Sequence, residues 1–293
     1  MENTRLNFEC ISCLLDKHLK KIPQNADESL KLKYAKELLK MIYEAEPQVS
    51  APEITEQITE LYAEIFGCSE DFTEIKRYFN ELMLSKETQI NTKIQDSKDK
   101  LCAALKYAML GNYIDFGAMN SVDENKLSDM LENAQEIEIN NLEYNNLKND
   151  LKTAKKLVYL TDNCGEIALD KQFLKQIKLQ FPKIELQVIV RGKNVLNDAT
   201  MEDALQVGMP EIAPVIGNGS GVAGNSLGKI SAVALEKINN ADVIIAKGQG
   251  NFETLCFCGK NIYYIFMCKC KFFANRFGVP QYTGMLINDL RMK

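Results

Sequence analysis

A strand that ends in two polar residues and passes straight into a helix most constrains how this 293-residue chain can fold. The stretch spans residues 157–167 and starts as an apolar run of strand-forming residues. Asp162 and Asn163 end the run, and a helical pattern begins at Glu166. Two oxygen-bearing side chains suit a core poorly, but at the carboxyl end of a parallel strand they can hold a hard cation or a polar ligand. The stretch therefore predicts an α/β fold with a site at one edge of its sheet.

The second half of the chain alternates predicted strands with predicted helices. The strands are predicted at 156–161, 185–190, 212–215, 243–246 and 262–266. The helices are predicted at 166–180, 200–206, 227–238 and 272–277. Such alternation with short connections is typical of a mostly parallel sheet with helices on both faces. We therefore predict a three-layer, Rossmann-like α/β architecture.

The first hundred residues show helical patterns and no strand signal. Apolar residues recur at spacings of three and four through residues 30–42. Ser50 followed by Pro52 is typical of a helix start. We therefore predict an all-helical N-terminal domain over residues 1–100 and an α/β metal-binding catalytic domain over residues 101–293.

Composition and charge exclude several classes of partner. Hydrophobic residues make up 46% of the chain and charged residues 26%, which is ordinary globular usage. The net charge of −5 argues against a general affinity for nucleic acid or an anionic membrane. No apolar run approaches the roughly 20 residues of a membrane span, and the N-terminus lacks the pattern of a signal peptide. We expect a cytoplasmic protein, and its oligomeric state stays open.

Polar clusters follow three of the predicted strands, at residues 162–166, 191–200 and 247–253. Because the carboxyl ends of parallel strands lie on one edge of a sheet, we expect the three clusters to converge. A further segment, residues 111–117, is bounded by glycines and carries polar residues among apolar ones, which predicts a loop of the same site.

The side chains of these clusters have complementary chemistry. Asp162, Asn163 and Asp198 supply the oxygen ligands that Mg²⁺, Mn²⁺ and similar ions prefer. Arg191 and Lys247 supply positive charge. The nearby glycines let backbone N–H groups approach an anion. Each cluster alone is compatible with a helix cap or a turn, but together they predict a metal beside a phosphate-binding pocket.

The clusters together resemble the signatures of the damage-control phosphatase family, which is also called domain of unknown function 89 or the acidic-residue methyltransferase-like metal-binding domain. The resemblance covers nearly the whole chain and points to the prokaryotic branch. The matching segments are Asp162-Asn163-x-Gly165-Glu166, residues 191–192 with 196–200, residues 247–253, Gly111-Asn112-x-Ile114-Asp115 and Cys10-x-x-Cys13.

The resemblance implies metal-dependent phosphatase activity on a small phosphorylated metabolite, such as a sugar phosphate, with Mn, Co, Ni or Mg as the divalent metal. It implies that Asp162, Asn163 and Asp198 are the metal ligands and that Lys247 contacts the phosphate. Asp115 and Glu166 are the predicted catalytic residues, which orient water or a substrate hydroxyl. The other predicted substrate-binding residues are Arg191, Asn112, Asn197, Gly248 and Asn251. Two of these have simpler alternatives: Arg191 as a salt bridge to a local carboxylate and Asn197 as a brace for the Asp198 loop.

Other functions stay open at this point. An S-adenosylmethionine-dependent carboxyl methyltransferase or a nucleotide-binding protein is the second hypothesis, although the turn 162–165 lacks Gly-x-Gly-x-x-Gly. A zinc or redox site is the third, because the nine cysteines include the pairs Cys10/Cys13, Cys256/Cys258 and Cys268/Cys270. The one histidine, His18, excludes a multi-histidine zinc site, and we expect it on a helix surface or in domain packing. The substrate itself cannot be read from these residues.

Overall fold

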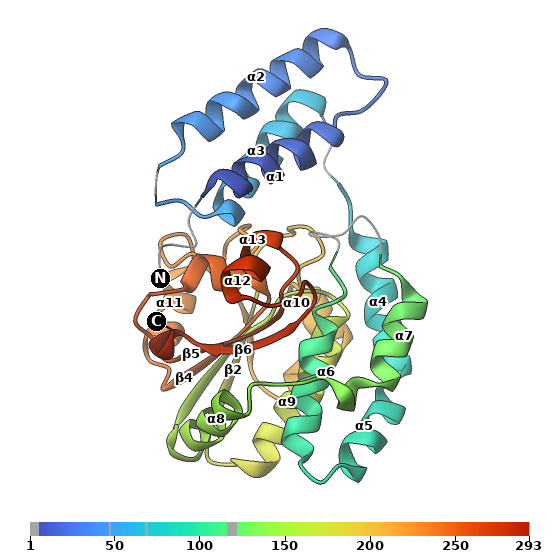
Figure 1. The fold of residues 1–293 in the computed structure, drawn as a ribbon, viewed down its shortest axis with the longest axis vertical. Helices are drawn as coiled ribbons and strands as arrows, with labels where there is room; N and C mark the ends of the chain where they lie inside the picture. The colour runs from blue at the N-terminus through green and yellow to red at the C-terminus, as the bar shows by residue number, and fades with distance from the viewer. Residues whose placement is uncertain (1–5, 47, 68–69, 116–121, 293) are drawn as a thin grey trace.

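A six-stranded sheet forms the centre of the computed structural model, which describes residues 6–46, 48–67, 70–115 and 122–292 (Figure 1). The strand order is β3-β2-β1-β4-β5-β6, and only β6 runs antiparallel to its neighbour. The predicted mostly parallel α/β sheet is therefore confirmed. The strands are β1 (Lys156–Leu160), β2 (Glu185–Val190), β3 (Val215–Gly217), β4 (Val243–Lys247), β5 (Ile262–Met267) and β6 (Gly284–Asn288).

Two strand predictions were wrong at the sheet edges. The strand predicted at 212–215 begins only at Val215, because residues 209–211 form the 3₁₀ turn η2 and the N–H of Ile212 donates to Met209 within that turn. The edge strand β6 was not predicted.

The central strands are buried on both faces, which explains their continuous apolar sequence. Leu157 and Tyr159 of β1 belong to the core on one side of the sheet, and Val158 and Leu160 belong to the core on the other. Strands β4 and β5 alternate in the same way.

Helices cover both faces of the sheet and make it the middle of three layers (Figure 1). One core is closed by α4 (Thr73–Ser85), α5 (Glu87–Asp96), α6 (Lys100–Gly111), α7 (Glu124–Glu132), α8 (Asn141–Thr153), α9 (Glu166–Gln180) and α10 (Met201–Gln206), with the turns η1 (Ala134–Glu136) and η2 (Met209–Glu211). The opposite core is closed by α11 (Ala232–Asn239), α12 (Gln249–Leu255) and α13 (Lys271–Phe277), and the turn η3 (Asp289–Arg291) follows β6.

Two helix predictions differ from the structure. The helix predicted at 227–238 begins at Ala232, because the hydroxyl oxygen of Ser231 accepts the N–H of Ala234 and caps the first turn. Helix α12 was not predicted, and Gly248 and Gly250, which flank its first residue, are atypical of a helix start.

Three helices form a separate unit at the top of Figure 1. They are α1 (Phe8–Lys20), α2 (Glu28–Glu44) and α3 (Ala51–Phe66), and they share a core around Tyr34 and Leu38. Ser50 and Glu53 form a capping box at the start of α3, as the sequence predicted. Helix α3 contacts α12, which follows the carboxyl end of β4, so this unit lies at the carboxyl edge of the sheet.

The boundary predicted at residue 100 stays a prediction. Helices α4 and α5 precede it but contact α9 and share the core beneath the sheet with α6.

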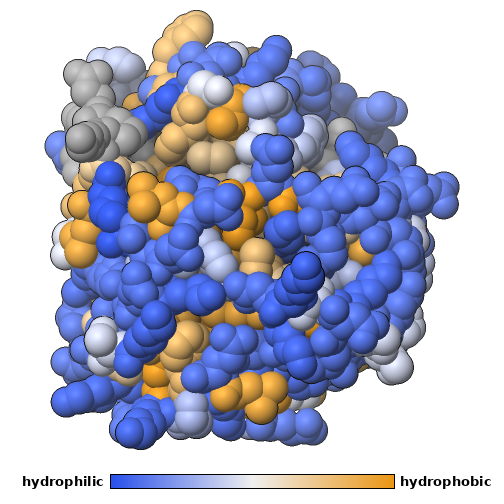
Figure 2. Space-filling model, turned by 60° about the horizontal axis from the view of Figure 1, so that its bottom comes forward, coloured by the Kyte–Doolittle hydropathy of each residue, from blue (hydrophilic) through white to orange (hydrophobic). Residues whose placement is uncertain are grey.

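The end of the molecule away from the three-helix unit has a mostly hydrophilic surface with separate hydrophobic patches (Figure 2). Among the described helices, none has the length and apolar character needed to cross a membrane.

His18 makes the stability of the three-helix unit depend on pH. The side chain is buried, and burial together with Lys17 and Lys21 lowers its pKa to about 4. The unfolded chain, with a pKa near 6.5, binds the proton first, so the neutral imidazole stabilises the fold fully above pH ~6.5 and loses this contribution as pH falls towards 4. We expect a loss of up to about 3 kcal/mol. Urea unfolding at pH 7 and pH 4.5 should show a larger loss for the wild type than for His18→Gln, and equal losses would contradict it.

Candidate active site

The three polar clusters meet where the strand order reverses. The chain runs from β1 outward through β2 and β3, and then returns to place β4 on the other side of β1. Ligands of open α/β sheets bind at such a point, outside the carboxyl ends of the strands. An isolated bridge between Asn163 and Asp198 joins the loops after β1 and β2, and a second bridge, between Arg191 and Thr200, lies within the loop after β2. The predicted convergence is therefore found.

Arg191 lies at the centre of this cluster and is almost completely buried. Its Nε donates to Asp198 Oδ2 at 2.5 Å, and one terminal nitrogen donates to Asp162 Oδ1 at 3.3 Å. The other donates to Asn251 Oδ1 at 3.4 Å. The structure thus contains the salt bridges that were the simpler alternative for Arg191, and its guanidinium links all three strand ends.

Glu166, the first residue of α9, accepts hydrogen bonds on both carboxylate oxygens. Its Oε2 accepts from Asn112 Nδ2 at 3.1 Å and from Asn163 Nδ2 at 3.0 Å. The same two amide groups also donate to Asp162 Oδ2, at 2.9 and 2.8 Å. Two carboxylates and two amides therefore interlock at the end of β1.

Lys247, at the end of β4, is fully buried beneath this cluster. Its ammonium group donates to Glu166 Oε1 at 2.5 Å, to Asp170 Oδ1 at 2.7 Å and to the carbonyl of Ala108 at 2.7 Å. A lysine has three N–H donors, so every donor already has a protein acceptor. The predicted contact of Lys247 with phosphate stays untested, and it would require breaking one of these buried bonds.

Asp115 and Lys269 lie at the outer side of the cluster. Lys269 Nζ donates to Asp115 Oδ2 at 2.6 Å, and the Asp115 side chain is 18% exposed. The negative charge of Asp115 raises the pKa of both Asp162 and Asp198, which places it in their neighbourhood. Phe116 and Gly117, the end of the predicted site loop, lie outside the described residues.

Asn197, Asn251 and Cys164 have contacts that serve the loops. Asn197 donates to the carbonyl of Ile114 at 3.2 Å, and its own carbonyl accepts the N–H of Cys164. Asn251 donates to the carbonyls of Thr161 and Lys247. Burial raises the pKa of the Cys164 thiol far above its usual range, which does not favour a nucleophile.

Gly248 allows β4 to approach Asp162 closely. Its φ is +80°, and a Cβ atom at this position would lie 1.9 Å from Asp162 Oδ2. Any residue with a side chain would therefore displace Asp162 as well as strain the backbone.

Burial of several carboxylates in one place disfavours their ionised forms. Burial, with Asp198 and Glu166 beside it, raises the pKa of Asp162 well above its usual range. Burial raises the pKa of Asp198 to about 6 and that of Asp170 to about 7, although Arg191 and Lys247, respectively, oppose the shift. The cluster therefore lacks positive charge.

Two oxygens of the predicted metal ligands are free to bind a cation. No described residue donates a hydrogen bond to Asn163 Oδ1 or to Asp198 Oδ1, and the two residues face each other across an isolated bridge. The donor set of two carboxylates and one amide suits a hard divalent ion. Within the described ranges, no three His, Cys, Asp or Glu side chains are grouped as a metal site would need. The same finding speaks against a zinc site among the described cysteines, which are free thiols.

The sequence reading missed Asp170 and Lys269. Asp170 lies four residues after Glu166 on α9, so helical periodicity alone places both on one face. Lys269 lies two residues after β5, between two cysteines, and no local pattern marks it as a site residue.

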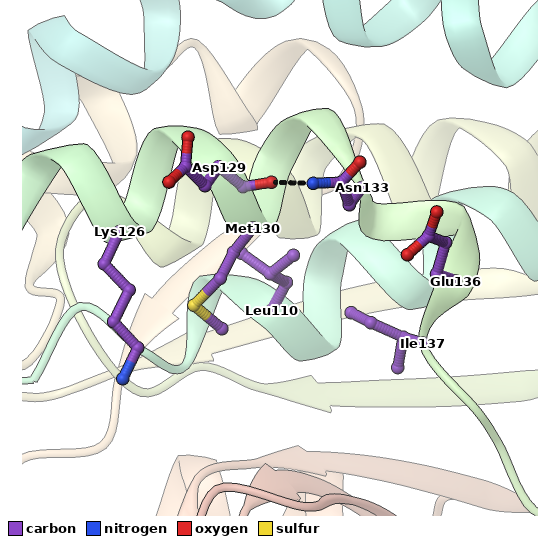
Figure 3. Close-up of a pocket in the computed structure, with 7 residues that line it drawn as sticks. All are labelled: Leu110, Lys126, Asp129, Met130, Asn133, Glu136 and Ile137. Carbon is purple, nitrogen blue, oxygen red and sulfur yellow. Dashed lines mark hydrogen bonds between the residues drawn. The ribbon is translucent and has the colours of Figure 1, made fainter.

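A cavity of about 360 Å³ lies elsewhere, between α6, α7 and η1. Figure 3 shows Lys126 and Met130 of α7, with Leu110 of α6 beside Met130. The lining contains no residue of the predicted site, and it consists of Leu110, Lys126, Asp129, Met130, Asn133, Glu136 and Ile137.

Comparison with known proteins gives one matching family model. The damage-control phosphatase ARMT1-like domain matches residues 7–285. Among solved structures, a DUF89 family protein from Pyrococcus horikoshii is similar with a TM-score of 0.80 and 26% identity, covering 97% of this chain and 99% of that one.

Curated relatives from archaea extend over most of the chain. An uncharacterized protein of Methanocaldococcus jannaschii is 31% identical over 98% of this chain and 96% of its own length. A protein named damage-control phosphatase from Pyrococcus horikoshii is 28% identical over 94% and 96%. Another of that name from Archaeoglobus fulgidus is 33% identical over 88% and 86%.

Gly248→Ala should destabilise the protein more than a glycine substitution with equal backbone strain alone. Gly259 provides the matched control, because its φ is +77° and nothing lies within 4 Å of the place that an alanine methyl group would take. We expect Gly259→Ala to cost about 1 kcal/mol and Gly248→Ala at least about 3 kcal/mol, since only the latter collides with Asp162. Urea unfolding of both variants measures the difference. Equal losses would show that the contact between Gly248 and Asp162 is unimportant.

Proposed function

This chain belongs to the damage-control phosphatase ARMT1-like family, and on that premise we propose that it is a metal-dependent phosphatase acting on small phosphorylated metabolites. The names of two relatives support phosphatase activity. The observation that carries the finer proposal is that Arg191 binds both Asp162 and Asp198 at the carboxyl edge, where Asn163 bridges to Asp198. Sugar phosphates and related phosphate esters are the proposed substrates.

A divalent cation would balance the charge of this site. Five carboxylates gather there with three cationic side chains, which leaves two excess negative charges at full ionisation. We assign the ligands to Asp162, Asn163 and Asp198, with Mn²⁺, Co²⁺, Ni²⁺ or Mg²⁺ as the ion. Such an ion polarises a phosphoryl oxygen and lowers the pKa of bound water.

Lys269 is the cation best placed to contact the substrate phosphate. The donors of Lys247 are all used inside the protein, and Arg191 is committed to Asp162 and Asp198. Lys269 pairs with a partly exposed carboxylate, that of Asp115. In this proposal the substrate phosphate replaces Asp115 as the partner of Lys269. Asp115 then orients water or a substrate hydroxyl.

Removing either metal-ligand carboxylate should abolish hydrolysis without unfolding the protein. We expect Asp162→Asn and Asp198→Asn to lower kcat/KM for para-nitrophenyl phosphate with Mn²⁺ by about 10³-fold, because a metal contributes several kcal/mol to the transition state. Both variants should stay folded, because asparagine keeps the shape and one acceptor oxygen of aspartate, although each loses an ionic contact with Arg191. Asp96→Asn, on the exposed surface of α5, is the control. Full activity of either site variant, or of the wild type in a chelator, would end the proposal.

Lys269→Met should weaken phosphate binding selectively. We expect the competitive inhibition constant of inorganic phosphate to rise about 10- to 100-fold, because a charge-assisted hydrogen bond is lost. Lys271→Met removes an exposed lysine two residues away and should leave this constant unchanged. The same rise in both variants would indicate a general charge effect, and no rise in Lys269→Met would remove Lys269 from the site.

A further inference from the structure

A group of ionic side chains beneath the strand ends is fully buried. Glu166, Asp170 and Lys247 are each completely shielded from solvent. Lys247 donates hydrogen bonds to both carboxylates, and the carbonyl of Ala108 accepts a third hydrogen bond from its ammonium group. The position of the ammonium group is therefore set by three acceptors that come from α6 and α9.

Asp170 is the second carboxylate that binds the ammonium group of Lys247. Its Oδ1 accepts from Lys247 and from the hydroxyl of Tyr159, each at 2.7 Å. Its Oδ2 has no hydrogen-bond partner among the described residues. Because Asp170 and Glu166 are one helical turn apart on α9, they hold Lys247 from one rigid element.

Glu166 carries this arrangement to the predicted metal ligands. Its Oε2 accepts the Nδ2 groups of Asn112 and Asn163 and also the N–H of Asn163 at 3.2 Å. An amide whose Nδ2 points at two carboxylates must turn its oxygen the other way. Asn112 Oδ1 accepts the N–H of Met267, whereas Asn163 Oδ1 accepts from no described donor. The free oxygen of Asn163 is thus oriented from below, through Glu166.

We propose that Lys247 and Asp170 are positioning residues, which hold Glu166 so that it turns the amide oxygen of Asn163 toward the metal site. The inference rests on the proposed function for the identity of the ion. It replaces the direct phosphate contact that the family resemblance implied for Lys247. Outer groups that orient a metal ligand typically affect metal affinity by 10- to 100-fold.

The test measures Mn²⁺ binding by calorimetric titration and phosphate inhibition at saturating Mn²⁺, as separate quantities. The single variants Glu166→Gln and Asp170→Asn keep the side-chain shape. The double variant Asp170→Asn with Lys247→Met removes both charges of that ion pair, so no unpaired buried charge is left at residue 170. We expect each to weaken Mn²⁺ binding by about 10- to 100-fold and to leave the phosphate inhibition constant within about twofold. Glu166→Gln combined with Asp170→Asn should bind Mn²⁺ no more weakly than Glu166→Gln alone, since both act through one group.

Glu87→Gln provides the matched control. Glu87 pairs with Lys171 of α9 outside the site, so its loss should lower the melting temperature but leave Mn²⁺ affinity unchanged. Mn²⁺ binding as tight as that of the wild type in folded Glu166→Gln and Asp170→Asn would overturn the inference. A raised phosphate constant with unchanged Mn²⁺ affinity in the Lys247 variant would also overturn it, in favour of a direct phosphate contact.

Failure of the proposed function gives a different result. If the wild type binds Mn²⁺ and the variants bind it more weakly, the positioning role stands even when no phosphate ester is hydrolysed. If the wild type binds no Mn²⁺, the positioning role is overturned together with the metal assignment.

Discussion

Burial of like charges at the ends of β1 and β2 is the constraint on which this structure depends. Asp162 and Asp198 are shielded from water, and each pKa is raised because the ionised forms are poorly solvated. Arg191 offsets part of this cost through hydrogen bonds to both carboxylates. Removing one member of such a buried pair is costlier than the net gain from forming it. The remaining deficit of positive charge supports the proposal that this edge binds a cation.

Two features of the fold fix the positions of these charged side chains. The reversal of strand order between β1 and β4 brings the loops after these strands together, and Gly248 lets β4 come within contact of Asp162. Beneath them, Lys247 stands between Glu166 and Asp170 at the base of α9. The polar residues therefore form two layers, with the proposed metal ligands above and the buried ion pairs of Lys247 below.

The position of the three-helix unit bears on substrate choice. Glu53 of α3 accepts a hydrogen bond from Ser226, and Glu56 pairs with Lys229, so α3 is tied to the segment that follows β3. The unit thus stands at the carboxyl edge of the sheet, on the same side as the proposed phosphatase site. These two contacts with the α/β layers are polar, in contrast to the apolar core inside the unit.

The sequence by itself determined the parallel α/β sheet, because strands buried on both faces read as continuous apolar runs. It also determined that Asp162, Asn163, Arg191 and Asp198 lie together, since parallel strands end on one edge. Tertiary structure decided which groups surround each lysine of the site. Lys247 ends β4 and Lys269 lies two residues after β5. Only the packing of α6 and α9 shows that Lys247 is enclosed by three acceptors, and only the folded chain brings Lys269 to the partly exposed carboxylate of Asp115. The local sequence pattern shows whether a segment is a helix or a strand. The burial of a side chain and its hydrogen-bond partners depend on residues far apart in the chain.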